Sequence, residues 1–249
     1  MRVAAISDIH GNLPALEAVL AEVEREKPDL IVVCGDVASG PMPSETIELL
    51  KTLHQTRFVQ GNADRGLIEE FDGKPASAMP GPFADWCAAQ IDRAQRDFLA
   101  SFEPTVAIED VDGLGRVLFC HATPHNDTDV MTVETPLDRM RTHLSGVEAD
   151  VVVCGHTHMQ FDRMVDRVRV VNAGSVGMTY GEPGAYWAML GPGAKMRRTE
   201  YDRSAAAERI RAKDWSGADE FARKNVMTVP SIGEAMDFMR KVEAKQAGA

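Results

Sequence analysis

The strongest constraint on this sequence is a series of short apolar runs that each end in a cluster of polar residues. Arg2–Ile6, Leu30–Cys34 and Arg57–Gln60 have the length and composition of buried strands. Between them, apolar residues recur at helical spacing over residues 13–23, and a second helix is predicted over Ser44–His54. This β-α-β-α order is typical of an α/β fold.

The middle and later parts of the chain have a different pattern. A long helix is predicted over Phe83–Phe102 from its helix-forming residues. Val106–Glu109 and Arg116–Cys120 flank a turn at Asp112-Gly113, which predicts a hairpin. The remaining predictions are a helix and five short strands: Thr135–Leu144, then Asp150–Cys154, Gln160–Asp162, Val168–Val171, Tyr186–Leu190 and Lys195–Tyr201. The sheet content is therefore divided into an early βα half and a later, more antiparallel half.

The simplest domain organisation is one domain over residues 1–203, with a helical C-terminal extension over residues 204–249 that packs on it. A length of 249 residues fits one large domain. The extension is helical in composition and is broken near Pro230-Ser231, where Ser231 and Glu234 form a predicted capping box. Asp72–Pro82 is rich in Gly, Pro and Ala and is predicted to be a surface excursion.

Charge and composition exclude several classes of function. A formal charge of −11 argues against extended binding to nucleic acid or to an anionic membrane. No run approaches the roughly 20 apolar residues that cross a bilayer, and residues 1–7 lack a signal-peptide pattern, so we expect a cytoplasmic protein. The cysteines show no CxxC pairing and are predicted to be small buried hydrophobes: Cys34, Cys87, Cys120 and Cys154.

Five short clusters carry side chains that can bind metal: Asp8-Ile9-His10, Gly35-Asp36, Gly61-Asn62-Ala63-Asp64, His121 and Gly155-His156-Thr157-His158. Each directly follows a predicted strand, and the carboxyl ends of strands form the binding crevice in open α/β sheets. Imidazole, carboxylate and amide groups together suit metals of intermediate hardness. A single strand-end histidine is more often structural than a ligand, so the prediction of a metal site rests on the ordered conjunction of all five clusters.

This ordered set resembles the pattern D-x-H, G-D, G-N, H and G-H-x-H of the calcineurin-like metallophosphoesterases, over roughly residues 1–190. Within that superfamily, residues 7–12 (SDIHGN) and 172–177 (NAGSVG) resemble the small bacterial and archaeal phosphodiesterase branch. The resemblance implies an α/β fold, a four-layer αββα sandwich of two mixed sheets with the metals between them. It also implies two divalent metal ions, with Mn²⁺ favoured and Fe, Zn, Ni or Mg as alternatives.

By position, the resemblance assigns the first metal to Asp8, His10, Asp36 and His158, and the second to Asp36, Asn62, His121 and His156. Asp36 would bridge the two ions, and Asp36, Asn62 and His121 would position the nucleophile and the phosphate. The implied reaction is attack on phosphorus by a hydroxide that bridges the two metals. A small phosphodiester is the favoured substrate, with phosphomonoesters, including phosphoproteins, as the alternative.

The sequence departs from the family at Ala63, where many members have the histidine that protonates the leaving group. A general acid typically contributes about 10²–10⁴-fold, so its loss predicts a rate that depends steeply on the leaving group. His125 is the nearest candidate to replace it, and the alternative is an exposed loop histidine.

Three further residues are candidates for supporting roles. Asp64 is expected to orient a ligand histidine, as outer carboxylates often do. Arg65 is expected to meet a phosphate oxygen, although either residue could be a surface salt-bridge partner. Asn12 could cap the first helix or contact substrate, and capping is favoured.

Two other classes of protein are alternatives to a two-metal phosphoesterase. One is an interaction scaffold that keeps the fold without catalysis, although none of the seven expected ligands is missing. The other is a nuclease, which the acidic charge and the lack of a basic strip disfavour. The sequence is compatible with a homo-oligomer and does not define its partners further.

Overall fold

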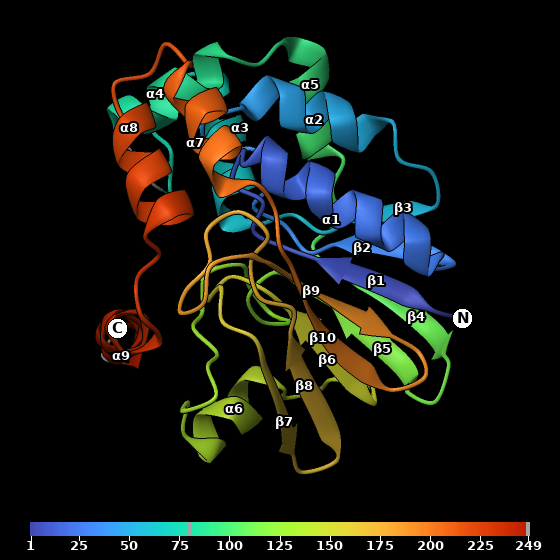
Figure 1. Ribbon diagram of the computed structural model, residues 1–249. Helices are drawn as coiled ribbons and strands as arrows, with labels where there is room; N and C mark the ends of the chain where they lie inside the picture. The colour runs from blue at the N-terminus through green and yellow to red at the C-terminus, as the bar shows by residue number, and fades with distance from the viewer. Residues whose placement is uncertain (79–80, 248–249) are drawn as a thin grey trace.

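The computed structural model describes residues 1–78 and 81–247, and it contains two five-stranded sheets packed face to face with helices outside them (Figure 1). The first sheet consists, in order, of β10 (Ala194–Thr199), β9 (Ala185–Leu190), β1 (Val3–Ile6), β2 (Leu30–Val33) and β3 (Thr56–Phe58). Strands β1, β2 and β3 are parallel, and β9 and β10 are antiparallel additions to the β1 edge. The crossovers between the parallel strands are α1 (Leu13–Glu26) and α2 (Pro43–Lys51).

The second sheet consists, in order, of β4 (Val106–Val111), β5 (Gly115–Phe119), β6 (Val151–Cys154), β8 (Val168–Asn172) and β7 (Phe161–Val165). Its three central strands are parallel, and β4 and β7 pair antiparallel at the two edges. The predicted hairpin at Asp112-Gly113 is confirmed as the connection between β4 and β5. Both sheets are therefore mixed, as expected.

Three apolar layers separate the four layers of the sandwich. Side chains alternate along β1, so that Ile6 packs with Leu16 of α1 while Ala5 packs with Val117 of the second sheet. The outer face of the second sheet packs on α6 (Leu137–His143) through Met140. This arrangement confirms the predicted four-layer αββα sandwich.

The remaining helices are α3 (Asn62–Phe71), α4 (Pro82–Ala89), α5 (Arg93–Ala100), α7 (Arg203–Arg211), α8 (Ala218–Phe221), the π-helix η1 (Ala222–Met227) and α9 (Ile232–Ala247). The prediction of one helix over Phe83–Phe102 is wrong, because the chain breaks at residues 90–92 between α4 and α5. Asp92 begins α5 with a capping box, in which its carboxylate accepts from the Gln95 N–H at 2.8 Å and the Gln95 side chain accepts from the Asp92 N–H at 3.1 Å. This local start signal overrides the helix-forming composition on either side of it.

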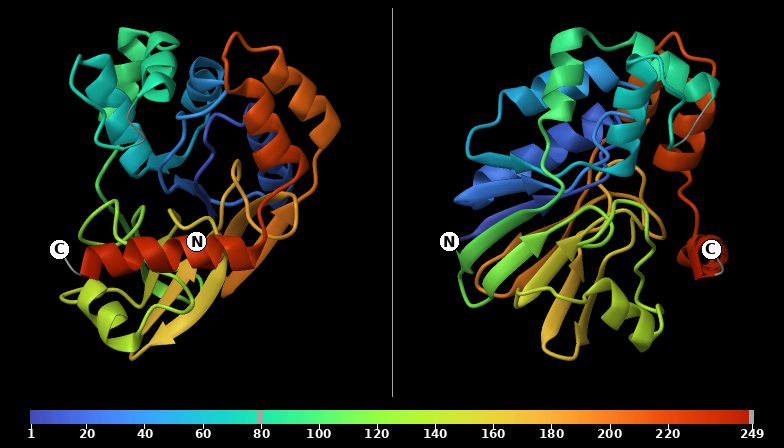
Figure 2. Two further views of the ribbon diagram at one scale, coloured as in Figure 1. Left: turned by 90° about the vertical axis from the view of Figure 1, so that its left-hand side faces the viewer. Right: turned by 180° about the vertical axis from the view of Figure 1, so that it is seen from behind.

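The C-terminal extension is helical and packs in two places, as Figure 2 shows. Helix α7 buries Ala206 and Ile210 against Leu13 and Met42. After residues 228–231 the chain enters α9, which lies across the molecule beside α6. The predicted capping box at its start is confirmed, since Ser231 Oγ accepts from the Glu234 N–H at 3.2 Å and Glu234 accepts from the Ser231 N–H at 2.8 Å. The boundary at residue 203 stays a prediction.

All four cysteines are free and buried, as predicted. Residues 72–78 form neither helix nor strand, and the rest of the predicted excursion Asp72–Pro82 includes residues 79–80, which lie outside the described residues, and Pro82, which begins α4. Within the described ranges, no helix has both the length and the apolar character that crossing a membrane requires.

Candidate metal centre

The predicted ligands lie in loops at the carboxyl ends of strands from both sheets. Asp8 and His10 follow β1, and Asp36 follows β2. Backbone hydrogen bonds join these two loops, with the Asp8 N–H donating to the Gly35 carbonyl and the His10 N–H to the Asp36 carbonyl, both at 3.0 Å. In the second sheet, the Gly155 N–H donates to the His121 carbonyl at 2.9 Å. Parallel pairing within each sheet therefore places the ligand loops at a common end.

Six of the seven predicted ligands form two groups of converging donor atoms: Asp8, His10 and His158 in the first, and Asp36, His121 and His156 in the second. In the first group, His158 Nε2 lies 3.2 Å from both His10 Nε2 and Asp8 Oδ1. In the second, His121 Nε2 lies 3.4 Å from Asp36 Oδ2 and 3.2 Å from His156 Nδ1.

Asp36 lies between the two groups. Its Oδ2 atom is 3.7 Å from His10 Nε2 of the first group and 3.4 Å from His121 Nε2 of the second. The other oxygen, Oδ1, accepts a hydrogen bond from the Ala63 N–H at 2.7 Å. The carboxylate is thus fixed with one oxygen facing both groups.

Asn62, the seventh predicted ligand, faces the second group. Its amide oxygen lies 3.0 Å from His121 Nε2 and 3.0 Å from His156 Nδ1. Rotation of the amide by 180° would instead let its nitrogen donate to these ring nitrogens. A cation held by the ring nitrogens favours the orientation with the oxygen inward, because amide oxygen binds metals and amide nitrogen does not.

Backbone carbonyls orient all four imidazoles. Nδ1 of His10, His121 and His158 contacts the carbonyls of Ser39, Cys34 and Met178 at 3.2, 2.7 and 2.7 Å, and His156 Nε2 contacts that of Thr128 at 3.2 Å. A carbonyl only accepts hydrogen bonds, so each of these ring nitrogens carries a proton. In a neutral ring the opposite nitrogen then has its lone pair directed into the site, as metal-ligating histidines require.

The electrostatics of the site fit a pair of cations. Asp8 Oδ1 is buried and has no hydrogen-bond donor in the described part of the chain. Burial disfavours charge on His121, yet the neighbouring Asp36 carboxylate raises the pKa of His121 to about 10. Burial, followed by the charge repulsion of His121, lowers the pKa of His156 to about 4. Buried lone pairs and carboxylate oxygens that converge in this way repel one another unless positive charge lies between them, so the donor set fits two divalent metal ions.

The loops reach this geometry through unusual backbone conformations. Five of the predicted ligands have positive φ values: Asp8 at 54°, His10 at 48°, Asp36 at 56°, His156 at 64° and His158 at 60°. Such left-handed conformations disfavour non-glycine residues by roughly 1–3 kcal/mol each, and they persist where the surrounding structure enforces them. In this site, positive φ values occur at residues whose side chains converge.

Glycines next to ligands let the loops approach one another. A Cβ on Gly155 would lie 1.9 Å from Ser7 Oγ and 2.3 Å from Asp8 Oδ2. A Cβ on Gly61 would lie 2.2 Å from Asp36 Oδ1. The glycine of the G-N and G-H-x-H clusters is therefore a packing requirement, because any larger residue would displace a ligand.

Asp64 is close to the site, where its carboxylate binds backbone N–H groups, and its expected role in orienting a histidine stays a prediction. Among the described residues, its carboxylate accepts from three backbone N–H groups, those of Asp36 at 2.8 Å, Val37 at 2.9 Å and Gly61 at 3.0 Å. Burial, followed by the repulsion of Asp36, raises the pKa of Asp64 to about 7. Asp64 therefore joins the loop that carries Asp36 to the loop that carries Asn62.

Arg65 and Asn12 make structural contacts. The Arg65 guanidinium donates to both carboxylate oxygens of Asp127 at 2.7 and 3.0 Å, which is the salt-bridge alternative. The Asn12 side chain accepts from the Ala15 N–H at 3.4 Å and so caps α1, as favoured. Its amide nitrogen also donates to the Gly177 carbonyl at 3.0 Å.

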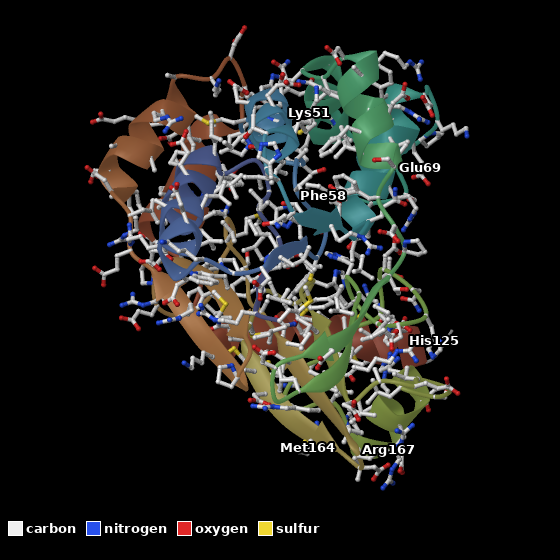
Figure 3. All side chains as sticks on the ribbon, turned by 90° about the vertical axis from the view of Figure 1, so that its right-hand side faces the viewer. Lys51, Phe58, Glu69, His125, Met164 and Arg167 are labelled. Atoms are coloured by element: carbon white, nitrogen blue, oxygen red, sulfur yellow. The ribbon has the colours of Figure 1, made fainter. Side chains whose placement is uncertain are left out.

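His125 lies at the surface, as Figure 3 shows, with Nε2 at 3.0 Å from the Ser145 carbonyl. It shares the lining of a cavity of about 180 Å³ with His121. None of the hydrogen bonds of His125 within the described chain reaches a ligand of either group. Its role as a replacement acid stays a prediction.

No sequence pattern indicates the backbone carbonyls that orient the histidines, since every residue has one. Nor does any pattern indicate Tyr180, whose ring stacks on His158 with a centroid distance of 5.7 Å.

Comparison with known proteins identifies the family. The family model described as calcineurin-like phosphoesterase superfamily domain matches residues 1–191. This chain belongs to that superfamily, which confirms the resemblance seen in its motifs. The match ends before α7, so the C-terminal extension lies beyond it. Assignment to the small phosphodiesterase branch stays a prediction.

Individual relatives match over most of the chain. An uncharacterized protein from Methanocaldococcus jannaschii is 28% identical over 244 residues, which cover 86% of this chain and 95% of that protein. A solved metallophosphoesterase from Sphaerobacter thermophilus has a TM-score of 0.70 at 23% identity, covering 91% of this chain and 99% of its own. A hypothetical protein from Pyrococcus horikoshii OT3 has a TM-score of 0.75 at 20% identity, covering 89% and 97%. At these identities the solved structures show a shared fold.

Proposed function

We propose that this protein is a phosphoester hydrolase that requires two divalent metal ions and prefers phosphodiesters to phosphomonoesters. The observation that carries the proposal is the position of Asp36 Oδ2, at 3.7 Å from His10 Nε2 and 3.4 Å from His121 Nε2. One carboxylate oxygen facing two donor groups suits a pair of cations about 3.5–4 Å apart. Membership of the calcineurin-like superfamily supports phosphoester hydrolysis as the reaction.

In this proposal each metal has four ligands: Asp8, His10, Asp36 and His158 for the first, and Asp36, Asn62, His121 and His156 for the second. Three neutral or anionic oxygen donors and four imidazoles favour Mn²⁺, with Fe, Zn, Ni and Mg as alternatives. When bound, such a metal pair supplies a hydroxide nucleophile near neutral pH and offsets negative charge on the phosphoryl oxygens.

The chain itself contributes rigid positioning. Asp36 is held through its Oδ1 atom by the Ala63 N–H, and His121 is held through its Nδ1 atom by the Cys34 carbonyl. Ala63 has no side-chain proton to donate, and its backbone N–H is already bonded to Asp36. We therefore expect the rate to rise steeply as the leaving group becomes more acidic.

The proposed substrate is a small phosphoester. A formal charge of −11 opposes extended contact with nucleic acid. Two bound divalent metals would nevertheless leave local positive charge at the site, because they carry more charge than the carboxylates of Asp8 and Asp36. A cytoplasmic location completes the proposal, and the sequence is also compatible with a homo-oligomer.

The test is metal analysis of the purified protein, followed by assays of mono-, di- and cyclic phosphoesters with Mn²⁺, Ni²⁺ or Mg²⁺. Asp36→Asn should remove most activity and weaken metal binding, because a neutral amide is a poor bridge. Asp237→Asn, which changes an exposed carboxylate on α9, is the matched control. Two bound metals with no turnover on any ester would favour the non-catalytic scaffold, and a wild-type protein that binds no metal would refute the centre itself.

A further inference from the structure

The C-terminal helix α9 reaches the loop that orients His156. Gln246, near the end of α9, donates from Nε2 to the Thr128 carbonyl at 2.8 Å. The same carbonyl lies 3.2 Å from His156 Nε2. One carbonyl oxygen thus joins the tail of the chain to a predicted ligand of the second metal.

The Gln246 side chain uses both ends of its amide in this contact. Its Oε1 atom accepts from the Val130 N–H at 3.1 Å while its Nε2 atom donates to Thr128. The amide therefore bridges an acceptor and a donor two residues apart in one loop. Such a two-point contact fixes the direction of the Thr128 carbonyl, which a single hydrogen bond would leave free to tilt.

Other contacts keep α9 in place over this loop. Ala235, Met236 and Met239 of α9 are buried with Val130 and Met159. The Arg139 guanidinium of α6 donates to the Glu243 carbonyl at 2.9 Å. Helix α9 is therefore docked by an apolar cluster and by α6, independently of Gln246.

We propose that Gln246 is a positioning residue for the second metal group, holding the His156 ring through the Thr128 carbonyl so that Nδ1 faces His121 and Asn62. The inference rests on the proposed two-metal function and adds the C-terminal extension to the metal centre. It assigns a function to a segment beyond the family match, which ends at residue 191.

The mechanism follows from hydrogen-bond chemistry. A carbonyl can accept two hydrogen bonds, and here it takes one from Gln246 and one from His156. The second bond requires the proton of His156 to be on Nε2, which leaves the Nδ1 lone pair for a metal. Loss of such an outer contact typically weakens metal binding by about 10–100-fold.

The decisive variant is Gln246→Glu. A glutamate keeps an oxygen that accepts from Val130 and from Arg139, whose guanidinium lies 3.3 Å from Gln246 Oε1, so docking of α9 is retained. It replaces the donor to Thr128 by a second acceptor, which repels the carbonyl. Arg240→Ala is the control, because Arg240 lies on the same helix and pairs at the surface with Glu134 and Asp237.

The experiment titrates EDTA-stripped protein with Mn²⁺ alone, by calorimetry and by equilibrium dialysis. Wild type and Arg240→Ala should bind two Mn²⁺ per chain with the same two affinities. Gln246→Glu should bind the first as wild type does and the second about 10–100-fold more weakly. Long-range ¹H–¹⁵N spectra of the histidine rings should show His156 as the Nε2–H tautomer in wild type and as a mixture in the variant.

The outcomes separate the inference from the proposed function. Unchanged affinity for both ions in Gln246→Glu, or an equal loss at both sites, would overturn the positioning role. A wild-type protein that takes up no Mn²⁺ would overturn the metal centre, and the inference with it.

Discussion

The Asp64 carboxylate provides the sharpest test of how the ligand loops are held together. It is fully buried and accepts hydrogen bonds from the N–H groups of Asp36, Val37 and Gly61 at 2.8–3.0 Å. Asp64→Ala would leave these three buried donors without an acceptor. Each buried unsatisfied group costs about 1–3 kcal/mol, and relaxation reduces the sum, so we expect the free energy of unfolding to fall by about 3–6 kcal/mol.

Asp64→Asn should be milder because it keeps one oxygen. In the wild type Oδ2 accepts from both Asp36 and Gly61, and Oδ1 accepts from Val37 alone. An amide oxygen at the Oδ2 position would satisfy two of the three donors, so we expect a loss of about 1–3 kcal/mol. Stability should therefore decrease in the order wild type, Asn, Ala.

The assay is urea unfolding followed by circular dichroism in the presence of EDTA, so that the change cannot arise through bound metal. Total stabilities of about 5–15 kcal/mol make a loss of this size easy to measure. Asp237→Ala, at an exposed carboxylate, is the control and should leave the unfolding midpoint unchanged. An Asp64→Ala protein as stable as wild type would refute the view that this carboxylate joins the two loops.

Three further predictions concern the site. Gly155→Ala should abolish tight metal uptake, because its Cβ would lie 2.3 Å from Asp8 Oδ2. The control Gly233→Ala should bind Mn²⁺ normally, because no atom lies nearer than 3.9 Å to its Cβ. Equal binding by both variants would contradict the packing argument. Metal binding at pH 7 should release at least about one proton and should weaken as pH falls. The reason is that the pKa of His121 is raised to about 10, and this histidine must lose a proton before it can bind a metal. Calorimetry that gives the same heat of binding in buffers of different ionisation enthalpy would refute this. If His125 is the replacement acid, His125→Ala should lower the rate on alkyl esters selectively and raise the ratio of aryl to alkyl ester rates. An unchanged ratio would remove it from the mechanism and leave the contact of its ring nitrogen with the Ser145 carbonyl as a structural one.

Much of the fold could be predicted because its signals are local. The runs that became β1, β2 and β6 are short, apolar and followed by polar residues, so their ends and the ligands after them were visible in the sequence. The break between α4 and α5 was missed although Asp92 and Gln95 have the spacing of a capping box. Helix α3 was not predicted either, because its N-cap is Gly61, which makes no side-chain cap hydrogen bond.

The sequence by itself determined which metal-binding side chains are present and that each follows a strand. Residue type is read directly from the sequence, and strand periodicity is a pattern of neighbouring residues. Only the tertiary structure decided that one oxygen of Asp36 faces both groups, and that the Thr128 carbonyl contacts both His156 and a residue of the last helix. The physical reason is that backbone carbonyls are identical in every residue. Which of them meets a given imidazole depends on how segments 20 to 87 residues apart in the sequence pack, and no local pattern encodes that.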